Sequence, residues 1–482
     1  MTDADSVHRN FIAGEWVVGP SSSVNRNPSD TEDIVGHYSQ ADAIQARAAI
    51  EAAHAAFQDW QFSPIQQRFD ALERVGIELY ARREELGRLL SREEGKTLPE
   101  GIGEVTRAAY LFKFFASEAL RLSGELLPST RPGLTVEVTR EPVGTIGIIA
   151  PWNFPIAIPA WKIAPALCYG NTVVFKPAEL VPGSAWALAE IISRAGLPKG
   201  VFNLVMGRGS VVGEEIVNAR EVRAITFTGS TATGARIAAR AVARHAKIQL
   251  EMGGKNPLVI LDDAQLETAV SVAINGAYHS TGQRCTASSR LIVTQGIYPR
   301  FLEVLTQRLD ALRVGHALET GTDIGPVVDQ SQLDIDLDYI ALGQAEGATL
   351  HRGGQRLERG RPGFYLQPAL FTESTASMRI NQEEIFGPVA SVIRVRDYDE
   401  ALHVANDIPL GLSSGIVTTS LRHASDFRRK SQAGMVMVNV PTAGVDYHVP
   451  FGGRKESSYG PKEQGRHAAE FYTAQKTAYI EP

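Results

Sequence analysis

The middle of the chain alternates between short apolar runs and amphipathic stretches. The apolar runs have the length and composition of buried strands, and they cover residues 143–150, 172–176, 201–206, 222–228 and 247–251. Between them, apolar residues recur at helical spacing over residues 158–167, 184–195, 210–218 and 231–242. Apolar strands separated by crossover helices form parallel sheets that are covered on both faces. We therefore predict an α/β fold with a doubly wound, Rossmann-like sheet.

The pattern before this region is different. Residues 11–18 place apolar residues on either side of an Ala-Gly turn and predict a short hairpin. Residues 41–60, 64–90 and 99–120 predict long amphipathic helices that cover a sheet. In residues 134–141 the period changes to two, which predicts a strand with one polar face. This strand could be an edge strand used in assembly.

Composition narrows the class of protein. With 482 residues, of which 44% are hydrophobic, the chain is expected to form two or three domains. The net charge is −6 and the 48 Lys and Arg residues are scattered, so we expect no nucleic acid partner. The two cysteines have no CxxC or Cys/His spacing, so we expect no metal site and a reducing compartment. Residues 1–6 lack signal-peptide features and no apolar run could span a bilayer, which predicts a cytoplasmic protein with no membrane partner.

Polar and glycine-rich motifs follow the carboxyl ends of the predicted strands, where ligands bind in doubly wound sheets. They are Trp152-Asn153, Lys176-Pro177-Ala178-Glu179, Gly207-Arg208-Gly209 and the turn from Gly229 to Gly234. The last motif precedes a predicted helix, whose free N–H groups and dipole favour a phosphate, although a plain tight turn explains the spacing equally well. Glu179 could accept hydrogen bonds from ribose hydroxyls, whereas spacing alone favours a solvated ion pair with Lys176.

Three side chains have the chemistry that acyl oxidation on sulfur requires. Cys285 follows a glycine-containing turn and precedes small polar residues, so its thiol could be a nucleophile. A structural thiol is the alternative, because no base is adjacent in sequence. Glu251 ends an apolar strand before a Gly-Gly turn, and Asn153 is an amide donor held between two prolines. Cys168, at the apolar end of a predicted helix, is expected to be buried and inert.

Several segments resemble, in the same order, the signature blocks of the NAD(P)-dependent aldehyde dehydrogenase superfamily: Pro151-Trp152-Asn153-Phe154-Pro155, Lys176-Pro177-Ala178-Glu179, Phe227-Thr228-Gly229-Ser230-Thr231, Leu250-Glu251-Met252-Gly253-Gly254-Lys255, Gly282-Gln283-Arg284-Cys285 and Glu384-Ile385-Phe386-Gly387-Pro388. The resemblance covers nearly the whole chain. The one departure is Met252, where the family often has Leu, and this change conserves volume.

The resemblance implies a domain organisation. Residues 1–120 and 141–252 would form the NAD-binding domain, and residues 253–440 the catalytic domain. Residues 121–140 and 441–482 would form an oligomerisation segment, in which the strand near Val136 pairs with the C-terminal tail. In the family such strands join subunits, so the resemblance implies a homodimer or homotetramer.

The resemblance also implies residue roles. Cys285 would attack the aldehyde, and Asn153 with the Cys285 backbone N–H would stabilise the oxyanion. Glu251 would activate the water that hydrolyses the thioester. The resemblance also places Lys176 among the catalytic residues. The residues implied to bind the cofactor are Ile149, Trp152, Lys176, Glu179, Gly209, Gly229, Ser230, Glu384 and Phe386. A carboxylate at Glu179 accepts from a free 2′-hydroxyl, which favours NAD, with NADP possible.

The segment 440–465 is similar to that of family members that oxidise 2,5-dioxopentanoate to 2-oxoglutarate. A carboxylate on the aldehyde requires a cation or several donors in the pocket, and Arg284, Ser280 and His448 are the candidates. For Arg284 a structural ion pair is an equal alternative. The full set of implied substrate contacts is Phe154, Trp161, Arg284 and Phe451.

Two further functions stay open at this stage. The first is a dehydrogenase for succinic or glutaric semialdehyde, or for a broad range of aliphatic and aromatic aldehydes, using the same thiol and base. The second is a catalytically silent binding protein that keeps the fold, against which the intact Cys285, Glu251 and Asn153 argue.

Overall fold

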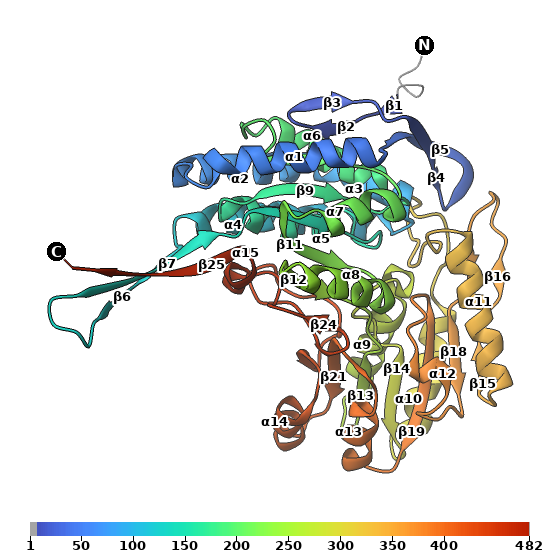
Figure 1. Ribbon diagram of the computed structural model, residues 1–482. Coiled ribbons are helices and arrows are strands. Elements are labelled where there is room, and N and C mark those ends of the chain that lie inside the picture. The colour runs from blue at the N-terminus through green and yellow to red at the C-terminus, as the bar shows by residue number, and fades with distance from the viewer. Residues whose placement is uncertain (1–6, 482) are drawn as a thin grey trace.

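A computed structural model describes residues 7–481, so the N-terminal segment examined for a signal peptide lies outside the described residues. One half of the molecule is built on an eight-stranded sheet in the order β24-β12-β11-β8-β9-β10-β2-β3 (Figure 1). Its strands are β2 (Asn10–Ile12), β3 (Glu15–Val17), β8 (Thr145–Ile149), β9 (Thr172–Lys176), β10 (Phe202–Leu204), β11 (Val222–Thr228), β12 (Lys247–Glu251) and β24 (Ser458–Tyr459). The strands from β8 to β12 are parallel, and their order reverses at β8. The predicted doubly wound sheet is therefore confirmed, with its switch point between β8 and β11.

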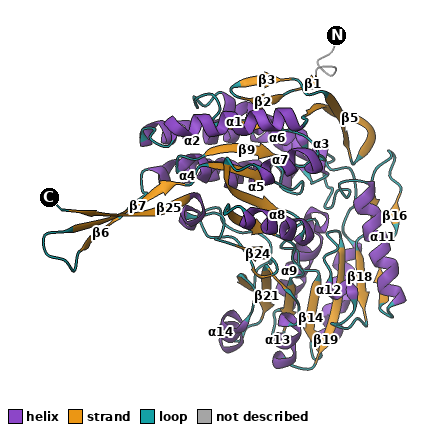
Figure 2. Cartoon of the chain, viewed as in Figure 1, coloured by secondary structure: helices purple, strands orange, loops and turns teal. Residues whose placement is uncertain are grey.

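Helices cover both faces of this sheet, as Figure 2 shows. One face packs on α1 (Ala43–Trp60), α7 (Glu214–Asn218) and α8 (Thr231–Ala243). The other face packs on α5 (Ala157–Cys168) and α6 (Pro182–Ser193), which are covered in turn by α2 (Ile65–Ala81), α3 (Arg83–Glu94) and α4 (Leu98–Ala119). Cys168 is buried at the end of α5, as predicted.

The other half contains a seven-stranded sheet in the order β15-β18-β19-β14-β13-β21-β22. Its strands are β13 (Pro257–Ile260), β14 (Arg290–Thr294), β15 (Thr349–Arg352), β18 (Ala369–Thr372), β19 (Val389–Val395), β21 (Ser413–Val417) and β22 (Met435–Val438). The helices of this half are α9 (Leu266–Tyr278), α10 (Tyr298–Asp310), α11 (Gln330–Ala345), α12 (Arg379–Gln382), α13 (Tyr398–Asn406) and α14 (Leu421–Lys430). All strand pairs except β15–β18 are parallel, so this half is also α/β.

A three-stranded sheet projects from the body of the molecule (Figure 1). It consists of β6 (Glu125–Pro128), β7 (Thr135–Pro142) and β25 (Thr473–Ile480). The expected pairing of β7 with the C-terminal tail is confirmed over the whole of β25. The prediction that β7 is an edge strand is wrong, because β6 pairs with its other side.

The structure also differs from prediction near the N-terminus. Residues 64–90 are not one helix, because Arg82 leaves helical geometry (φ −97°, ψ 12°) and separates α2 from α3. Strands β4 (Ser21–Asn27) and β5 (Asp30–Gln40) form a sheet with β1 (Val7–His8) that the polar sequence did not predict.

The remaining elements are short. Residues 210–218 are a π-helical turn, Gly209–Gly213, followed by α7, in place of one helix. The others are β16 (Arg356–Leu357), β17 (Tyr365–Leu366), β20 (Leu410–Gly411), β23 (Arg454–Lys455) and α15 (Ala469–Tyr472). Within residues 7–481 no helix has the length and apolar character needed to cross a bilayer.

Candidate active site

Cys285 lies in the loop between α9 and β14, and its side chain is partly exposed. The loop begins with three consecutive residues in the left-handed region: Ser280 (φ 51°), Thr281 (φ 57°) and Gly282 (φ 66°). A Cβ on Gly282 would come within 2.2 Å of the carbonyl oxygen of Gly387, so only glycine fits there. The turn directs the chain away from the end of α9 and holds the cysteine loop against the segment around Glu384, about 100 residues later in the sequence.

Asn153 follows β8 and reaches the same loop. Its Nδ2 donates to the carbonyl oxygen of Gln283 at 3.1 Å. Its own carbonyl accepts from Nζ of Lys96 at 2.7 Å, and Lys96 also lies 2.8 Å from Glu104. Glu104 in turn accepts from two backbone N–H groups at the start of α5. This buried pair fixes the segment that carries Asn153. Neither charge was predicted to act here, because in the sequence both resemble a solvated helix face.

Glu251 is at the carboxyl end of β12 and is 3% exposed. The C-terminal strand β24 runs antiparallel to β12 and places Ser458 opposite Glu251. Ser458 Oγ donates to Glu251 Oε2 at 2.5 Å. Burial, helped by the charge of Glu463, raises the pKa of Glu251 to about 8, while the Ser458 hydrogen bond lowers it. A carboxyl group that titrates near neutral pH is suited to general base catalysis.

The thiol of Cys285 experiences the same acidic surroundings. Burial raises its pKa to about 12, with further contributions from Glu384, Glu251 and Glu463. The thiol is therefore protonated at neutral pH in the free protein. It requires a base, or a positive charge brought in by a ligand, to become a nucleophile.

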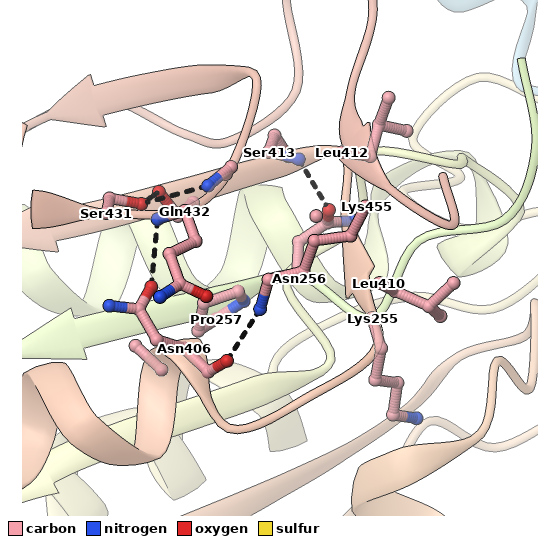
Figure 3. A pocket seen from close by; sticks show the side chains of 14 residues that line it. Lys255, Asn256, Pro257, Asn406, Leu410, Leu412, Ser413, Ser431, Gln432 and Lys455 are labelled. Carbon is pink, nitrogen blue, oxygen red and sulfur yellow. Dashed lines mark hydrogen bonds between the residues drawn. The ribbon is translucent and has the colours of Figure 1, made fainter. Parts of the chain in front are cut away.

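Asn256 fixes the backbone of the cysteine loop. Its Nδ2 donates to the carbonyl oxygens of Cys285 (2.7 Å) and Ala287 (2.9 Å). Its Oδ1 accepts from the backbone N–H of Ser413, as Figure 3 shows. The cavity in that view has a volume of about 10 Å³, room for about one water molecule, so it is not a substrate site. Lys255 points away from the other labelled side chains there, and burial lowers its pKa to about 7.

A larger cavity of about 330 Å³ opens beside the cysteine. Its lining includes the nucleophile candidate and all the expected substrate contacts: Phe154, Trp161, Arg284, Cys285 and Phe451. The rings of Trp161 and Phe451 are 5.3 Å apart and form an aromatic wall. Ser280 also lines the cavity, whereas the exposed His448 does not.

Two arginines line this cavity. Arg284 makes none of the ion pairs found within residues 7–481, and its Nη2 donates to the carbonyl oxygens of Asn275 and Gly276 at the end of α9. The ion-pair interpretation of Arg284 is therefore wrong. Arg107, on α4, was not among the predicted residues, because a single arginine in an amphipathic helix gives no sequence signal.

The expected cofactor residues gather along the carboxyl edge of the eight-stranded sheet. Glu179 accepts from the backbone N–H of Gly209 at 3.0 Å, which joins the loops after β9 and β10. Lys176 is buried and donates to the carbonyl oxygen of Pro177. The solvated ion pair of Lys176 with Glu179 is therefore wrong, since each group bonds a different partner.

The switch point between β8 and β11 holds further expected residues. Ile149 ends β8, and Gly229 follows β11 directly. Ser230 caps α8, accepting from the Thr233 N–H at 3.4 Å. Beside this turn Thr228 Oγ1 is buried without a hydrogen-bond partner in the described chain. An unsatisfied hydroxyl beside a helix N-terminus fits the binding of a polar, anionic ligand such as a dinucleotide.

Glu384, Trp152 and Phe386 connect this edge to the cysteine. Glu384 Oε1 accepts from the Gly254 N–H at 2.7 Å, and a Cβ on Gly253 would come within 2.4 Å of its carboxylate. The rings of Trp152 and Phe386 meet edge to face at 5.3 Å. Among the described residues no group of three or more His, Cys, Asp or Glu side chains could hold a metal ion.

Comparison with known proteins gives a consistent result. The model of the aldehyde dehydrogenase family matches residues 16–478. The chain is 45% identical to the alpha-ketoglutaric semialdehyde dehydrogenase of Bacillus subtilis over 99% of both chains. It is 42% identical to the alpha-ketoglutarate semialdehyde dehydrogenase of Haloferax volcanii, again over 99% of each.

A solved structure of betaine aldehyde dehydrogenase from Staphylococcus aureus in complex with NAD+ has the same fold. The TM-score is 0.96 at 34% identity, covering 98% of this chain and 95% of that chain. The similarity therefore extends through both large sheets and the projecting strands. The chain belongs to the aldehyde dehydrogenase family and is an oxidoreductase that acts on aldehydes.

Proposed function

We propose that this protein oxidises 2,5-dioxopentanoate to 2-oxoglutarate, with Cys285 as nucleophile and NAD as hydride acceptor. The observation that carries the proposal is the cavity of about 330 Å³ beside Cys285, which combines an aromatic wall with two arginines. An aldehyde that also carries a carboxylate suits such a cavity, because the carboxylate needs a cation when it leaves water. The names of the relatives from Bacillus subtilis and Haloferax volcanii support the same substrate.

The chemistry follows from the residues around the thiol. The sulfur of Cys285 adds to the aldehyde carbon, and the thiol proton leaves to water in the open cavity, a transfer that Glu251 would assist. The second amide hydrogen of Asn153 and the Cys285 N–H stabilise the oxyanion, a contribution of about 3–4 kcal/mol for one such donor. Loss of hydride from the thiohemiacetal leaves a thioester on Cys285. Glu251 then removes a proton from the water that releases the acid.

The residues at the sheet edge fit a dinucleotide. Lys176 and Glu179 would hold the adenosine ribose, Ser230, Gly229 and Gly209 would face the pyrophosphate, and Glu384 and Phe386 would position the nicotinamide ribose. Ile149 and Trp152 would line the same cleft. When bound, NAD supplies the hydride acceptor. We expect NAD to be preferred over NADP, because the Glu179 carboxylate would repel a 2′-phosphate.

We also propose the division of the chain. Residues 1–120 and 141–252 would bind NAD, residues 253–440 would carry Cys285, and residues 121–140 and 441–482 would join subunits into a homodimer or homotetramer. Exposed apolar residues on the projecting strands support assembly: Leu126 (71%), Leu127 (43%), Tyr479 (60%) and Ile480 (42%). Both cysteines are free thiols, which fits work in the reducing cytoplasm.

A substrate panel tests the proposal. NADH formation should be measured with 2,5-dioxopentanoate, succinic semialdehyde, pentanal and benzaldehyde, and compared as kcat/KM. We expect a clear preference for 2,5-dioxopentanoate. A flat profile, or one that favours uncharged aldehydes, would keep the dehydrogenase and reject this substrate.

A further inference from the structure

Arg107 lines the cavity, and some N–H groups of its guanidinium have no acceptor among the described residues. It projects from α4, and its Nη2 donates to Gln464 Oε1 at 3.0 Å. Its Cζ lies over the Trp161 ring, 5.7 Å from the ring centre, which is within the range of a cation–π contact. Its Nε is buried without a partner within residues 7–481, and no protein group there accepts from Nη1. The remaining donors of the fork are therefore unused by the protein.

The charges around Arg107 leave it uncompensated. The acidic groups near Arg107 are Glu104, Asp446 and the thiol of Cys285, yet none forms an ion pair with it among the described residues. Glu104 is already paired with Lys96, and Asp446 is exposed to solvent. Burial lowers the pKa of Arg107 to about 10, so the group still carries its charge at neutral pH. A charged, half-buried guanidinium without a counter-ion is unusual in a protein interior unless a ligand supplies one.

Gln464 explains why the guanidinium keeps this orientation. Its side chain is fully buried (0% exposed), and its backbone is in the left-handed region (φ 59°). Its neighbour Glu463 is locked in a buried ion pair with Lys162. The acceptor of Arg107 is therefore built into a rigid part of the C-terminal segment, which limits the rotation of the fork.

The second arginine of the cavity is placed differently. Arg284 directs its Nη2 onto two carbonyl oxygens at the C-terminal end of α9, where cations stabilise the helix. Its main contacts are thus to the protein. Arg284 also has a buried Nε without a partner among the described residues, but its Nη2 is held by two backbone carbonyls. Lys96, the third cation of the lining, is paired with Glu104. Arg107 is therefore the cation of this cavity that the protein holds by one neutral side chain and leaves without a counter-ion.

We propose that Arg107 is the specificity-determining residue that binds the carboxylate of the substrate, and that the site accepts short aldehydes carrying a terminal carboxylate. The proposal rests on the function proposed above, and it identifies the side chain that binds the end of the substrate opposite the aldehyde. The planar fork matches two carboxylate oxygens, and the hydrogen bond to Gln464 with the cation–π contact to Trp161 limits its movement. Burial of the pair behind Phe451 and Trp161 strengthens the attraction relative to water.

The ratio of kcat/KM for 2,5-dioxopentanoate to kcat/KM for pentanal, which has the same number of carbons and no carboxylate, tests the proposal. It should be measured for the wild type, Arg107→Met, Arg107→Lys and Arg284→Met with saturating NAD. In Arg107→Met the ratio should fall roughly 10- to 100-fold, the range expected for a lost charge-assisted contact. In Arg107→Lys, which keeps the charge without the fork, it should fall less. In Arg284→Met, kcat/KM should change by the same factor for 2,5-dioxopentanoate and for pentanal, so the ratio should not change.

The outcomes separate this proposal from the proposed function. A wild type without preference for 2,5-dioxopentanoate would reject the proposed substrate, whatever Arg107 does. A wild type with the preference and an Arg107→Met variant that retains it would overturn the role of Arg107 alone, as would a ratio that collapses in Arg284→Met instead. If circular dichroism shows that Arg107→Met is unfolded, Arg107→Lys provides the test. An unchanged ratio in that variant would contradict bidentate binding of the carboxylate by Arg107.

Discussion

At the scale of single residues, burial acts on Glu251 and Cys285 in the same direction. It raises the pKa of the carboxyl group to about 8 and that of the thiol to about 12. Both groups are therefore largely protonated in the free protein at pH 7. The carboxylate form of Glu251 increases as pH rises through about 8, which makes the base available on the alkaline side.

Ser458 tunes this titration. Its hydroxyl donates to Glu251 and lowers the pKa of the carboxyl group, so Ser458→Ala should raise that pKa further. Because only the deprotonated form is a base, the midpoint of the pH–rate profile for thioester hydrolysis should move to higher pH. Rapid-quench measurement of deacylation from pH 6 to 10 checks this. A midpoint that stays or moves down would rule out the hydrogen bond as the tuning contact.

Replacing Glu251 with Gln should separate the two half-reactions. The amide cannot accept the proton of water, so we expect deacylation to slow by roughly 10²- to 10⁴-fold. Stopped-flow absorbance should then show a burst of NADH followed by slow turnover, because water can still take the thiol proton during acylation. An unchanged steady-state rate would remove Glu251 as the base for deacylation.

At the scale of secondary-structure elements, the Lys96–Glu104 pair joins the start of α4 to the segment that follows β8. The two side chains are 2% and 1% exposed. Lys96→Met would leave Glu104 buried without its counter-ion, a change that typically costs about 3–5 kcal/mol. Urea unfolding should show this loss, and kcat should fall because Asn153 loses the contact that fixes its carbonyl.

Two further variants make the test specific. Lys96→Met combined with Glu104→Gln should recover part of the stability, because the unpaired charge is removed. Lys199→Met, which breaks the exposed pair of Lys199 with Glu15 (74% and 67% exposed), should leave unfolding unchanged. Equal destabilisation by Lys96→Met and Lys199→Met would show that burial of the first pair is irrelevant.

The elements that the sequence predicted are those whose pattern reports burial directly. The strands from β8 to β12 are apolar and lie in the interior of the sheet, so their position was readable. Strands β4 and β5 are polar and solvated on one side, and the break at Arg82 depends on one backbone angle. Neither the polar strands nor the helix break produces a periodic pattern of hydrophobic residues in the sequence.

The candidate site was predictable to the extent that it lies on motifs. Cys285, Asn153 and Glu251 were found from strand ends, turns and family resemblance, and the fold brings their segments together. Ser458, Lys96 and Arg107 were missed, because each acts through a contact with a residue distant in sequence. Only the paired strands and packed helices create those contacts.

At the scale of the whole molecule, the projecting sheet presents apolar side chains to solvent. Leu126 on β6 is 71% exposed. If these strands join subunits, Leu126→Glu should reduce the sedimenting mass, since it places a charge in the interface. Leu421→Glu, on α14 and 82% exposed, is the matched control and should leave the mass unchanged. Sedimentation velocity decides, and the same assembly for both variants would place the interface elsewhere.

By the proposed mechanism, oxidation proceeds through an acyl group on Cys285. Its most direct test is peptide mass spectrometry of Glu251→Gln, quenched with acid after mixing with NAD and 2,5-dioxopentanoate. We predict one 2-oxoglutaryl group on the peptide that contains Cys285, none on the peptide that contains Cys168, and none in a Cys285→Ala protein. A burst of NADH with an unmodified Cys285 peptide, or an adduct on another residue, would show that Cys285 is not the nucleophile.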